Sequence, residues 1–293
     1  MIQLHGSITA LITPFRDGAV DEAAFAALVE RQIAAGTHGV VPVGTTGESA
    51  TLSHDEHRRV VSLCIEVVAG RVPVIAGAGS NSTAEAIALA QFAQEAGANA
   101  LLTVTGYYNK PSQSGLQAHF KAVHDAVHLP MILYNVPGRT IANLSVETVA
   151  RLSRLERIVA IKDATGDLAR VALQRLASGA DFIQLSGEDM TAVGFNAMGG
   201  HGCISVTSNI VPDLCAQMQQ ATLDGDWSAA RALQDRLAPL HDALFSDVSP
   251  GPAKYALSCL GLCTDEVRLP LVGPSDGAKA KVRAALAGLD LLS

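Results

Sequence analysis

The stretch "RIVAIKDATG", residues 157–166, decides the fold and raises the first question about function. Residues 158–161 are apolar and mostly β-branched, and such a short continuous run is typical of a strand buried on both faces of a parallel sheet. A charged residue, Lys162, follows directly. Because a lysine is rarely buried without a partner, Lys162 either reaches water at the strand end or is held in a pocket for chemistry.

Seven other apolar runs repeat along the first two-thirds of the chain, separated by amphipathic, alanine-rich stretches such as DEAAFAALVERQIAAG, residues 21–36. Buried strands that alternate with helices predict an α/β fold, a closed (β/α)₈ TIM barrel, and a doubly wound open sheet is the alternative. The expected strands cover residues 7–13, 38–43, 72–77, 99–105, 130–136, 157–162, 182–186 and 201–206.

After Val206 no strand pattern returns, and three or four helical segments run to the end of the chain. We therefore expect a (β/α)₈ catalytic barrel over 1–224 and a C-terminal helical extension over 225–293 that packs on it. Ser53 with Glu56, and Ser82 with Glu85, have the spacing of a capping box, so a helix should begin after each serine.

The composition excludes several classes of protein. The 293 residues carry a net charge of −7 and no basic block, which argues against nucleic acids and anionic membranes as partners. The N-terminus lacks the pattern of a signal peptide, and no run approaches the ~20 apolar residues of a membrane span, so we expect a cytoplasmic protein. Five cysteines without a CxxC pair predict reduced thiols and no metal site.

Polar, glycine-rich motifs follow the expected strands at their C-terminal ends. In a (β/α)₈ barrel this face carries the active site, so Lys162 is expected at the mouth of a pocket beside groups from other strands. Neither a P-loop nor a dinucleotide-binding glycine pattern is present, so a nucleotide site has little support. The motifs are GTTGES (44–49), GAGSNS (77–82), GYYNKP (106–111), YNVPGRT (134–140), KDATG (162–166) and SGED (186–189).

A lysine at this position either pairs with an anion or acts as a nucleophile. Burial favours the neutral amine, which attacks carbonyl carbons to form an imine. Tyr134, expected at the same depth on the adjacent strand, is the nearest candidate for a proton shuttle, although a core tyrosine is the alternative. The turn GTTGES offers hydroxyls and N–H groups that suit an anion. The segment HDEH (54–57) lacks the HExxH zinc spacing, and a solvated helix start is its simplest interpretation.

Several long motifs in order resemble one family. GTTGESATLSHDEH, VPVIAGAGSN, YYNKPSQSGL, YNVPGRT, IKDATG and GGHGCISVTSN together are similar to the 4-hydroxy-tetrahydrodipicolinate (dihydrodipicolinate) synthases. These enzymes belong to the N-acetylneuraminate lyase superfamily of class I aldolase-like barrels. The resemblance runs from GSITALITPF near the N-terminus to VRLP (267–270), nearly the whole chain.

The resemblance implies a Schiff-base reaction with no separate cofactor, in which pyruvate condenses with L-aspartate 4-semialdehyde in lysine and diaminopimelate biosynthesis. Lys162 would form the imine with pyruvate, and Arg139 would bind the semialdehyde carboxylate. Thr45 and Tyr134 would relay protons with Tyr108, which the family contributes across a dimer interface. The remaining substrate-binding positions implied in the same way are Thr46, Gly187 and Ile204.

The resemblance also implies regulation and assembly. Members of this family that are inhibited by L-lysine bind it at a dimer interface, and the family usually forms a dimer of dimers. A homotetramer and feedback inhibition by L-lysine are therefore expected. The matching effector positions are Ser49, Ala50, His54, His57, Asn81, Glu85 and Tyr107.

Three departures from the family pattern bear on the second substrate. The segment SDVSPGPAK (246–254) replaces an EPNPIPVK-like stretch, Gly106 stands where a proline is common, and Ile141 stands where a glycine often follows RT. Another pyruvate-dependent aldolase or lyase of the superfamily, acting on 2-keto-3-deoxy sugar acids or N-acetylneuraminate, is the alternative function. A remoter alternative is a non-catalytic sensor of a 2-keto acid or lysine.

Overall fold

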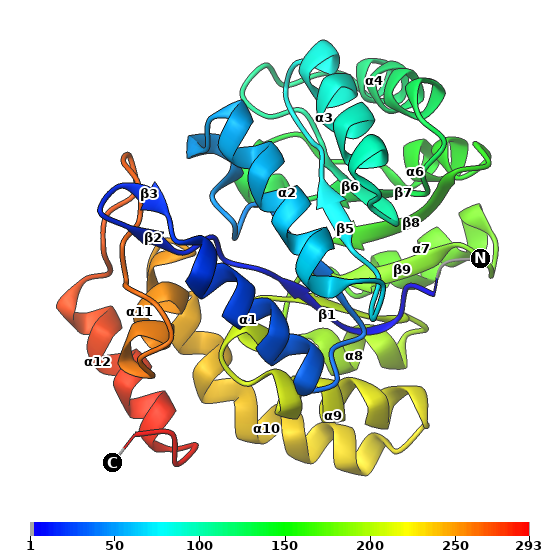
Figure 1. Ribbon diagram of the computed structural model, residues 1–293. Helices are drawn as coiled ribbons and strands as arrows, with labels where there is room; N and C mark the ends of the chain where they lie inside the picture. The colour runs from blue at the N-terminus through cyan, green and yellow to red at the C-terminus, as the bar shows by residue number, and fades with distance from the viewer. Residues whose placement is uncertain (1–2, 293) are drawn as a thin grey trace.

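The computed structural model describes residues 3–292, which form a barrel of eight parallel strands surrounded by helices (Figure 1). The strand order is β4-β1-β10-β9-β8-β7-β6-β5, and a bridge between Val40 and Val74 joins the two outermost strands of this order. The predicted (β/α)₈ barrel is confirmed. The strands are β1 (Gly6–Ala10), β4 (Gly39–Val41), β5 (Ile75–Gly77), β6 (Ala100–Val104), β7 (Met131–Asn135), β8 (Ile158–Asp163), β9 (Ile183–Ser186) and β10 (Gly202–Ser205).

The strands are mostly apolar because both of their faces are covered. One face points into the barrel, where Ile8, Ile75, Ile132 and Ile204 belong to a single buried cluster. The other face packs under the surrounding helices, where Val40, Leu101 and Ile161 belong to a second cluster. Removing apolar surface from water on both faces is the main favourable term that holds such a barrel together.

The surrounding helices begin where the sequence predicts. Ser53 and Glu56 form the complete capping box at the start of α2. The second expected box is only half formed, because Ser82 accepts from the Glu85 N–H while the Glu85 carboxylate bonds Ser80 and His54 instead. The barrel helices are α1 (Glu22–Ala34), α2 (His54–Val68), α3 (Thr83–Ala96), α4 (Gln113–Ala126), α6 (Val146–Leu152), α7 (Ala169–Ser178), α8 (Ala192–Ala197) and α9 (Pro212–Leu223).

The final helices share a core with the barrel. Leu240, Leu257 and Leu286 of these helices cluster with Ile12 and Ile210 of the barrel. The extension lies on the same side of the molecule as the β2–β3 hairpin (Figure 1). A boundary between residues 224 and 225 stays a prediction. The elements outside the barrel wall are β2 (Phe15–Arg16), β3 (Ala19–Val20), η1 (Ser49–Thr51), α5 (Pro137–Thr140), η2 (Thr207–Asn209), α10 (Trp227–Leu244), α11 (Gly251–Cys259) and α12 (Asp276–Ala287).

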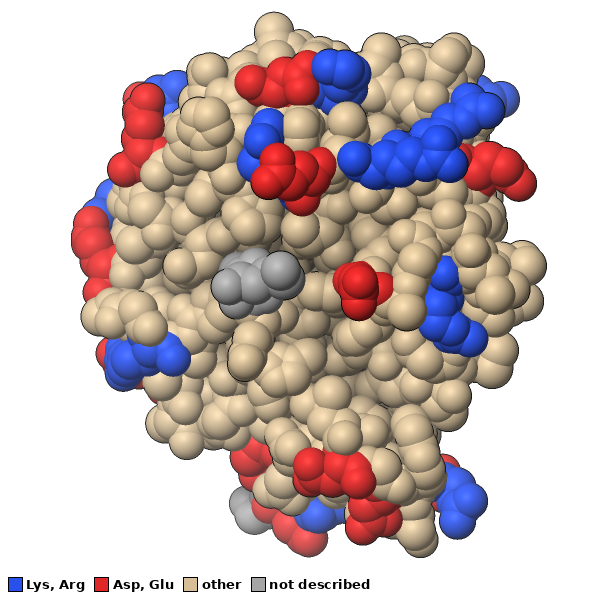
Figure 2. Space-filling model, turned by 90° about the vertical axis from the view of Figure 1, so that its right-hand side faces the viewer, with Lys and Arg blue, Asp and Glu red and all other residues tan. Residues whose placement is uncertain are grey.

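The surface carries charges of both signs. On the face shown in Figure 2, Lys and Arg side chains are interspersed with Asp and Glu around the edge. Within residues 3–292, no helix is long and apolar enough to cross a membrane. All five cysteines are free thiols, and Cys64, Cys203 and Cys215 are buried.

Candidate active site

Lys162 lies inside the mouth of the barrel and not in solvent. It sits at the C-terminal end of β8, and its side chain is only 5% exposed. Its partner across the β7–β8 ladder is Tyr134, and the Lys162 Nζ lies 4.3 Å from the centre of the tyrosine ring. Among residues 3–292, no carboxylate lies within ion-pair distance of this amine. The alternative of a solvated lysine is therefore wrong, and so is that of a lysine paired with a carboxylate.

Two further predicted residues lie in the same part of the barrel, and one of them is next to Lys162. Gly187, directly after β9, leaves the space that the lysine uses, because an added Cβ would lie 3.0 Å from Lys162 Cε and 2.7 Å from Ala164 Cβ. Ile204 on β10 is buried in the barrel interior in the same cluster as Tyr134. Lys162 therefore stands in a narrow slot between β7 and the end of β9.

The GTTGES motif forms a tight turn after β4. The Gly47 N–H donates to the Gly44 carbonyl and the Glu48 N–H to the Thr45 carbonyl, at 3.0 and 3.1 Å. Val43 and Glu48, on either side of the two threonines, have φ values of 48° and 55°. Such positive φ values are costly for side chains with a Cβ, and most costly for a β-branched one, so the surrounding structure must hold the turn in place.

Tyr108 and Arg139 point outward from this copy of the chain. Tyr108 is 93% exposed, and no hydrogen bond within residues 3–292 joins its hydroxyl to Thr45 or Tyr134. Arg139 is exposed on the short helix α5. The next residue but one, Ile141, has a φ of 63°, a conformation that a glycine adopts without strain. The departure at position 141 therefore places a β-branched residue in a strained backbone.

The predicted effector residues come together in part. His54 and Glu85 form an ion-pair contact of 2.8 Å, and hydrogen bonds from Ser80 and His54 hold the pKa of Glu85 below its ordinary value. Burial lowers the pKa of His57 to about 4. Asn81 accepts from the Asn109 side chain through its carbonyl at 2.8 Å, which links it to the tyrosine loop. Ser49 lies in η1, Ala50 is exposed beside it, and Tyr107 is half-buried.

The sequence reasoning did not identify a second buried lysine. Lys254 in α11 is completely buried, forms an ion pair with Glu48 and donates to the Glu266 carbonyl at 2.8 Å. Burial lowers the pKa of Lys254, and the Glu48 carboxylate opposes that shift. The available signal was the lysine at the end of SDVSPGPAK, but nothing in its neighbours indicates burial.

A second unpredicted group supports β8 from outside. Asp163, which follows Lys162, accepts from Arg170 and from the Gln174 side chain, each at 2.9 Å. The Asp163 carboxylate also accepts from the Thr165 N–H and hydroxyl. These bonds fix the backbone from which Lys162 projects.

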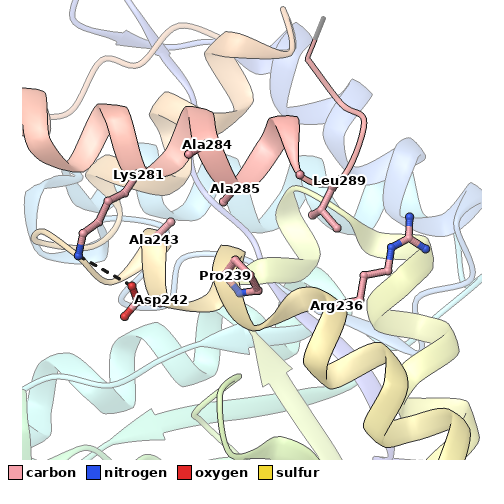
Figure 3. A pocket seen from close by; sticks show the side chains of 9 residues that line it. Arg236, Pro239, Asp242, Ala243, Lys281, Ala284, Ala285 and Leu289 are labelled. Atoms are coloured by element: carbon pink, nitrogen blue, oxygen red, sulfur yellow. Dashed lines mark ion pairs between the residues drawn. The ribbon is translucent and has the colours of Figure 1, made fainter.

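A surface groove lies apart from the residues around Lys162. It encloses about 400 Å³ between α10 and α12, and its apolar floor includes Pro239, Ala243 and Leu289 (Figure 3). Lys281 and Asp242 flank it with their charged atoms 3.9 Å apart. None of the predicted site residues lines this groove. In the part of the chain that the structure describes, no cluster of three or more His, Cys, Asp or Glu could hold a metal ion.

A buried lysine amine beside a tyrosine, at the mouth of a (β/α)₈ barrel, places the chain among barrel proteins with an active site at the C-terminal ends of their strands. Residues 3–289 match the model of the dihydrodipicolinate synthetase family. The chain is 64% identical over 288 residues to the 4-hydroxy-tetrahydrodipicolinate synthase of Parvibaculum lavamentivorans, covering 98% of this chain and 99% of that one.

Solved structures agree with this match. The chloride-inhibited dihydrodipicolinate synthase of Acinetobacter baumannii, complexed with pyruvate, superposes with a TM-score of 0.97 at 44% identity, over 99% of this chain and 100% of that one. The enzyme of Cyanidioschyzon merolae with lysine bound superposes with a TM-score of 0.95 at 38% identity, over 98% and 99%. The chain belongs to the dihydrodipicolinate synthetase family, and the prediction of an enzyme of this family, a lyase, is confirmed.

Proposed function

We propose that the enzyme condenses pyruvate with L-aspartate 4-semialdehyde through an imine on Lys162, giving 4-hydroxy-tetrahydrodipicolinate. The observation that carries this proposal is the buried Lys162 amine, which has no carboxylate partner among residues 3–292 and lies over the Tyr134 ring. The relative from Acinetobacter baumannii is complexed with pyruvate, which supports the same first substrate here.

The proposed reaction follows from the chemistry of the amine. Neutral Lys162 attacks the ketone carbon of pyruvate, and water leaves as the imine forms. The imine withdraws electrons, so the methyl group loses a proton to give an enamine. The enamine carbon attacks the aldehyde, and the new alkoxide takes up a proton. The amino group of the second substrate then attacks the imine carbon and releases the Lys162 amine, so one water is lost overall.

The proton transfers need groups that this single chain does not bring together. Thr45 and Tyr134 are proposed to form a relay with Tyr108 of a second copy. The 93% exposure of Tyr108, at a left-handed φ of 69°, supports this arrangement because an exposed, strained tyrosine suits an interface. Thr46 and the adjacent N–H groups are proposed to hold the pyruvate carboxylate, with Gly187 and Ile204 lining the slot.

Arg139 is proposed to bind the carboxylate of the semialdehyde. An exposed guanidinium on a short helix suits a carboxylate that arrives from solvent, and its planar fork permits two parallel hydrogen bonds. Arg139→Ala should raise the KM for the semialdehyde by about tenfold or more while the KM for pyruvate stays within about twofold. Equal changes in both KM values would remove this role.

L-lysine is proposed as a feedback inhibitor. The contact between His54 and Glu85 places a carboxylate where an ammonium group binds well, and the lysine-bound relative from Cyanidioschyzon merolae supports the same ligand. Glu85→Gln should abolish inhibition by millimolar L-lysine and leave turnover without lysine unchanged. Activity of the unmodified enzyme that does not respond to lysine would disprove the regulation alone.

The proposed assembly is a cytoplasmic homotetramer, built as a dimer of dimers in which each Tyr108 enters the partner's site. Sedimentation of the purified chain measures its mass in solution. Tyr108→Phe should lower turnover while the assembly stays intact.

The deciding experiment is turnover of pyruvate and L-aspartate 4-semialdehyde, coupled to a reductase that consumes the cyclic product. A signal that depends on both substrates supports the proposal. Borohydride should also trap pyruvate on Lys162, and mass spectrometry of the peptide locates the modification. Trapping without turnover would keep the imine and direct the search to other aldehydes, whereas no trapping would overturn the mechanism.

A further inference from the structure

A buried ion pair joins the GTTGES turn to the C-terminal extension. Glu48 belongs to the turn, Lys254 belongs to α11, and both side chains are fully shielded from solvent. Two charges can be buried together only when other bonds complete their coordination. Here the Lys254 amine also donates to the Glu266 carbonyl, and the second carboxylate oxygen of Glu48 accepts from the Arg268 N–H at 3.0 Å.

The same residues continue into a wider network. The Arg268 side chain holds the Glu56 carboxylate with two bonds of 2.6 and 2.8 Å and also donates to the Thr51 carbonyl. The Phe15 ring lies close to both cations, with its centre 3.9 Å from the Lys254 Nζ and 4.2 Å from the Arg268 guanidinium carbon. The segment around residue 268 is therefore fixed to the start of α2 and to the turn before it.

The turn held by this network is strained. Glu48 itself has a φ of 55°, and Val43 at the other end has a φ of 48°. On the barrel side the Thr13 hydroxyl donates to the Gly47 carbonyl at 2.7 Å, and a Cβ on Gly77 would lie only 2.3 Å from the Val43 carbonyl oxygen. The backbone of Thr45 and Thr46 lies between these points. Its conformation depends on tertiary contacts, and the ion pair with Lys254 is the one that joins two buried charges.

We propose that the Glu48–Lys254 pair is a positioning device that holds the Thr45–Thr46 backbone in the shape that binds the carboxylate of the 2-keto acid. The C-terminal extension is then part of the substrate site, although none of its residues touches substrate. This inference rests on the proposed function, in which Thr46 and its neighbouring N–H groups bind the pyruvate carboxylate. An apolar pair of similar size can stabilise a fold equally well. The presence of a buried ion pair here therefore favours a role in positioning the turn and not in stability alone.

The test is the pyruvate dependence of imine formation. The initial rate of borohydride trapping on Lys162 is measured against pyruvate concentration, together with the melting temperature. Lys254→Met removes the charge and keeps the volume, and the pyruvate concentration at half-maximal rate should rise about tenfold or more. Glu48→Gln is the second variant, and it should raise the half-saturating pyruvate concentration by a smaller factor. It replaces Lys254→Met in the test if that variant does not fold.

Two controls separate positioning from stability. Leu257→Ala, a buried truncation on the same helix, should lower the melting temperature yet leave the half-saturating pyruvate concentration within about twofold of the unmodified enzyme. Lys281→Met removes an exposed lysine of the extension and should change neither quantity. The double variant Glu48→Gln/Lys254→Met should regain stability, because no unpaired charge stays buried, but should keep its weak response to pyruvate.

The outcomes are distinct. Unchanged half-saturation in folded Lys254→Met or Glu48→Gln overturns the inference, as does an equal rise in Leu257→Ala. Recovery of both stability and pyruvate response in the double variant would show that the Glu48–Lys254 pair contributes to stability alone. That result also overturns the inference. If the unmodified enzyme itself is not trapped by pyruvate and borohydride, the proposed function fails first.

Discussion

Two buried lysines at the mouth of the barrel have opposite environments. Lys254 is completely buried and has a carboxylate, a carbonyl oxygen and an aromatic face around its amine. Lys162 is 5% exposed and lies over an aromatic face, but no carboxylate in the described part of the chain pairs with it. The first environment gives a buried cation its bonding partners, whereas the second places the amine beside an aromatic ring with no carboxylate of residues 3–292 in ion-pair distance.

The difference teaches how a protein separates a structural lysine from a reactive one. The Lys254 amine is enclosed by Glu48, the Glu266 carbonyl and the Phe15 ring, so no substrate carbonyl carbon can reach it. An amine without an anion, in a slot kept open by Gly187, is available to a substrate. The same residue type therefore serves stability in α11 and, in our proposal, chemistry in β8.

The most direct test of the contrast between the two lysines is Lys162→Ala. We expect turnover to fall about 10³-fold or more, because the nucleophile is lost, and trapping by borohydride to disappear. The melting temperature should change little, since no ion pair is broken. Near-normal turnover would contradict the proposed role, and a large loss of stability would show that Lys162 is structural.

The second prediction concerns Lys254, whose amine is paired with the Glu48 carboxylate. Lys254→Met should lower the free energy of unfolding by about 3–5 kcal/mol, because Glu48 stays buried without its partner. Thermal or urea unfolding measures this change at a fixed protein concentration. Glu48→Gln/Lys254→Met should regain most of it. A loss under about 1 kcal/mol in the single variant would mean that the pair is not energetically coupled.

The third prediction tests the slot around Lys162. Gly187→Ala adds a Cβ at 3.0 Å from Lys162 Cε and 2.7 Å from Ala164 Cβ, so the lysine must shift or the loop must open. We expect about 1–3 kcal/mol of destabilisation and slower trapping of pyruvate. Gly277→Ala is the matched control, since a Cβ there meets no other atom within 4 Å. Equal stability and equal trapping rates in the two variants would show that Gly187 does not make room for Lys162.

The fourth and smallest effect is the loss of stability as the pH falls below about 6.5. This loss should come from buried histidines and not from either lysine. Burial lowers the pKa of His57 from 6.5 to about 4, so the unfolded chain binds more protons and stability falls as the pH drops below about 6.5. Glu56, with a pKa lowered to about 2, contributes stability that is lost only below about pH 4.5.

Between pH 6.5 and 5, the change in the free energy of unfolding that comes from His57 can thus be measured apart from that of Glu56. His57 should account for about 1–2 kcal/mol of the loss at pH 5, measured by unfolding across this range. His57→Gln should flatten the profile, whereas Lys281→Met, which removes an exposed lysine, should leave its slope unchanged. An unchanged slope in His57→Gln would assign this loss of stability to other groups.

Much of this architecture is predictable from the chain, because short β-branched runs and amphipathic stretches report burial by their own pattern. The pairing of Tyr134 with Lys162 follows from their equivalent positions on consecutive parallel strands, and the ladder confirms it. The complete capping box at Ser53 is equally local. The half-formed box at Ser82 is not, since His54 and Ser80 compete for the Glu85 carboxylate from other segments.

The barrel, its polar mouth and the family could be predicted from the amino-acid sequence, because these depend on periodicity and on motifs whose residues are adjacent in the chain. The folded structure was needed to show that Lys254 is fully buried against Glu48, more than two hundred positions earlier in the chain. It also shows that Lys162 has no such partner within residues 3–292 and that Gly187 makes room for it. Whether a charge is satisfied depends on contacts distant in sequence, and no local pattern records them.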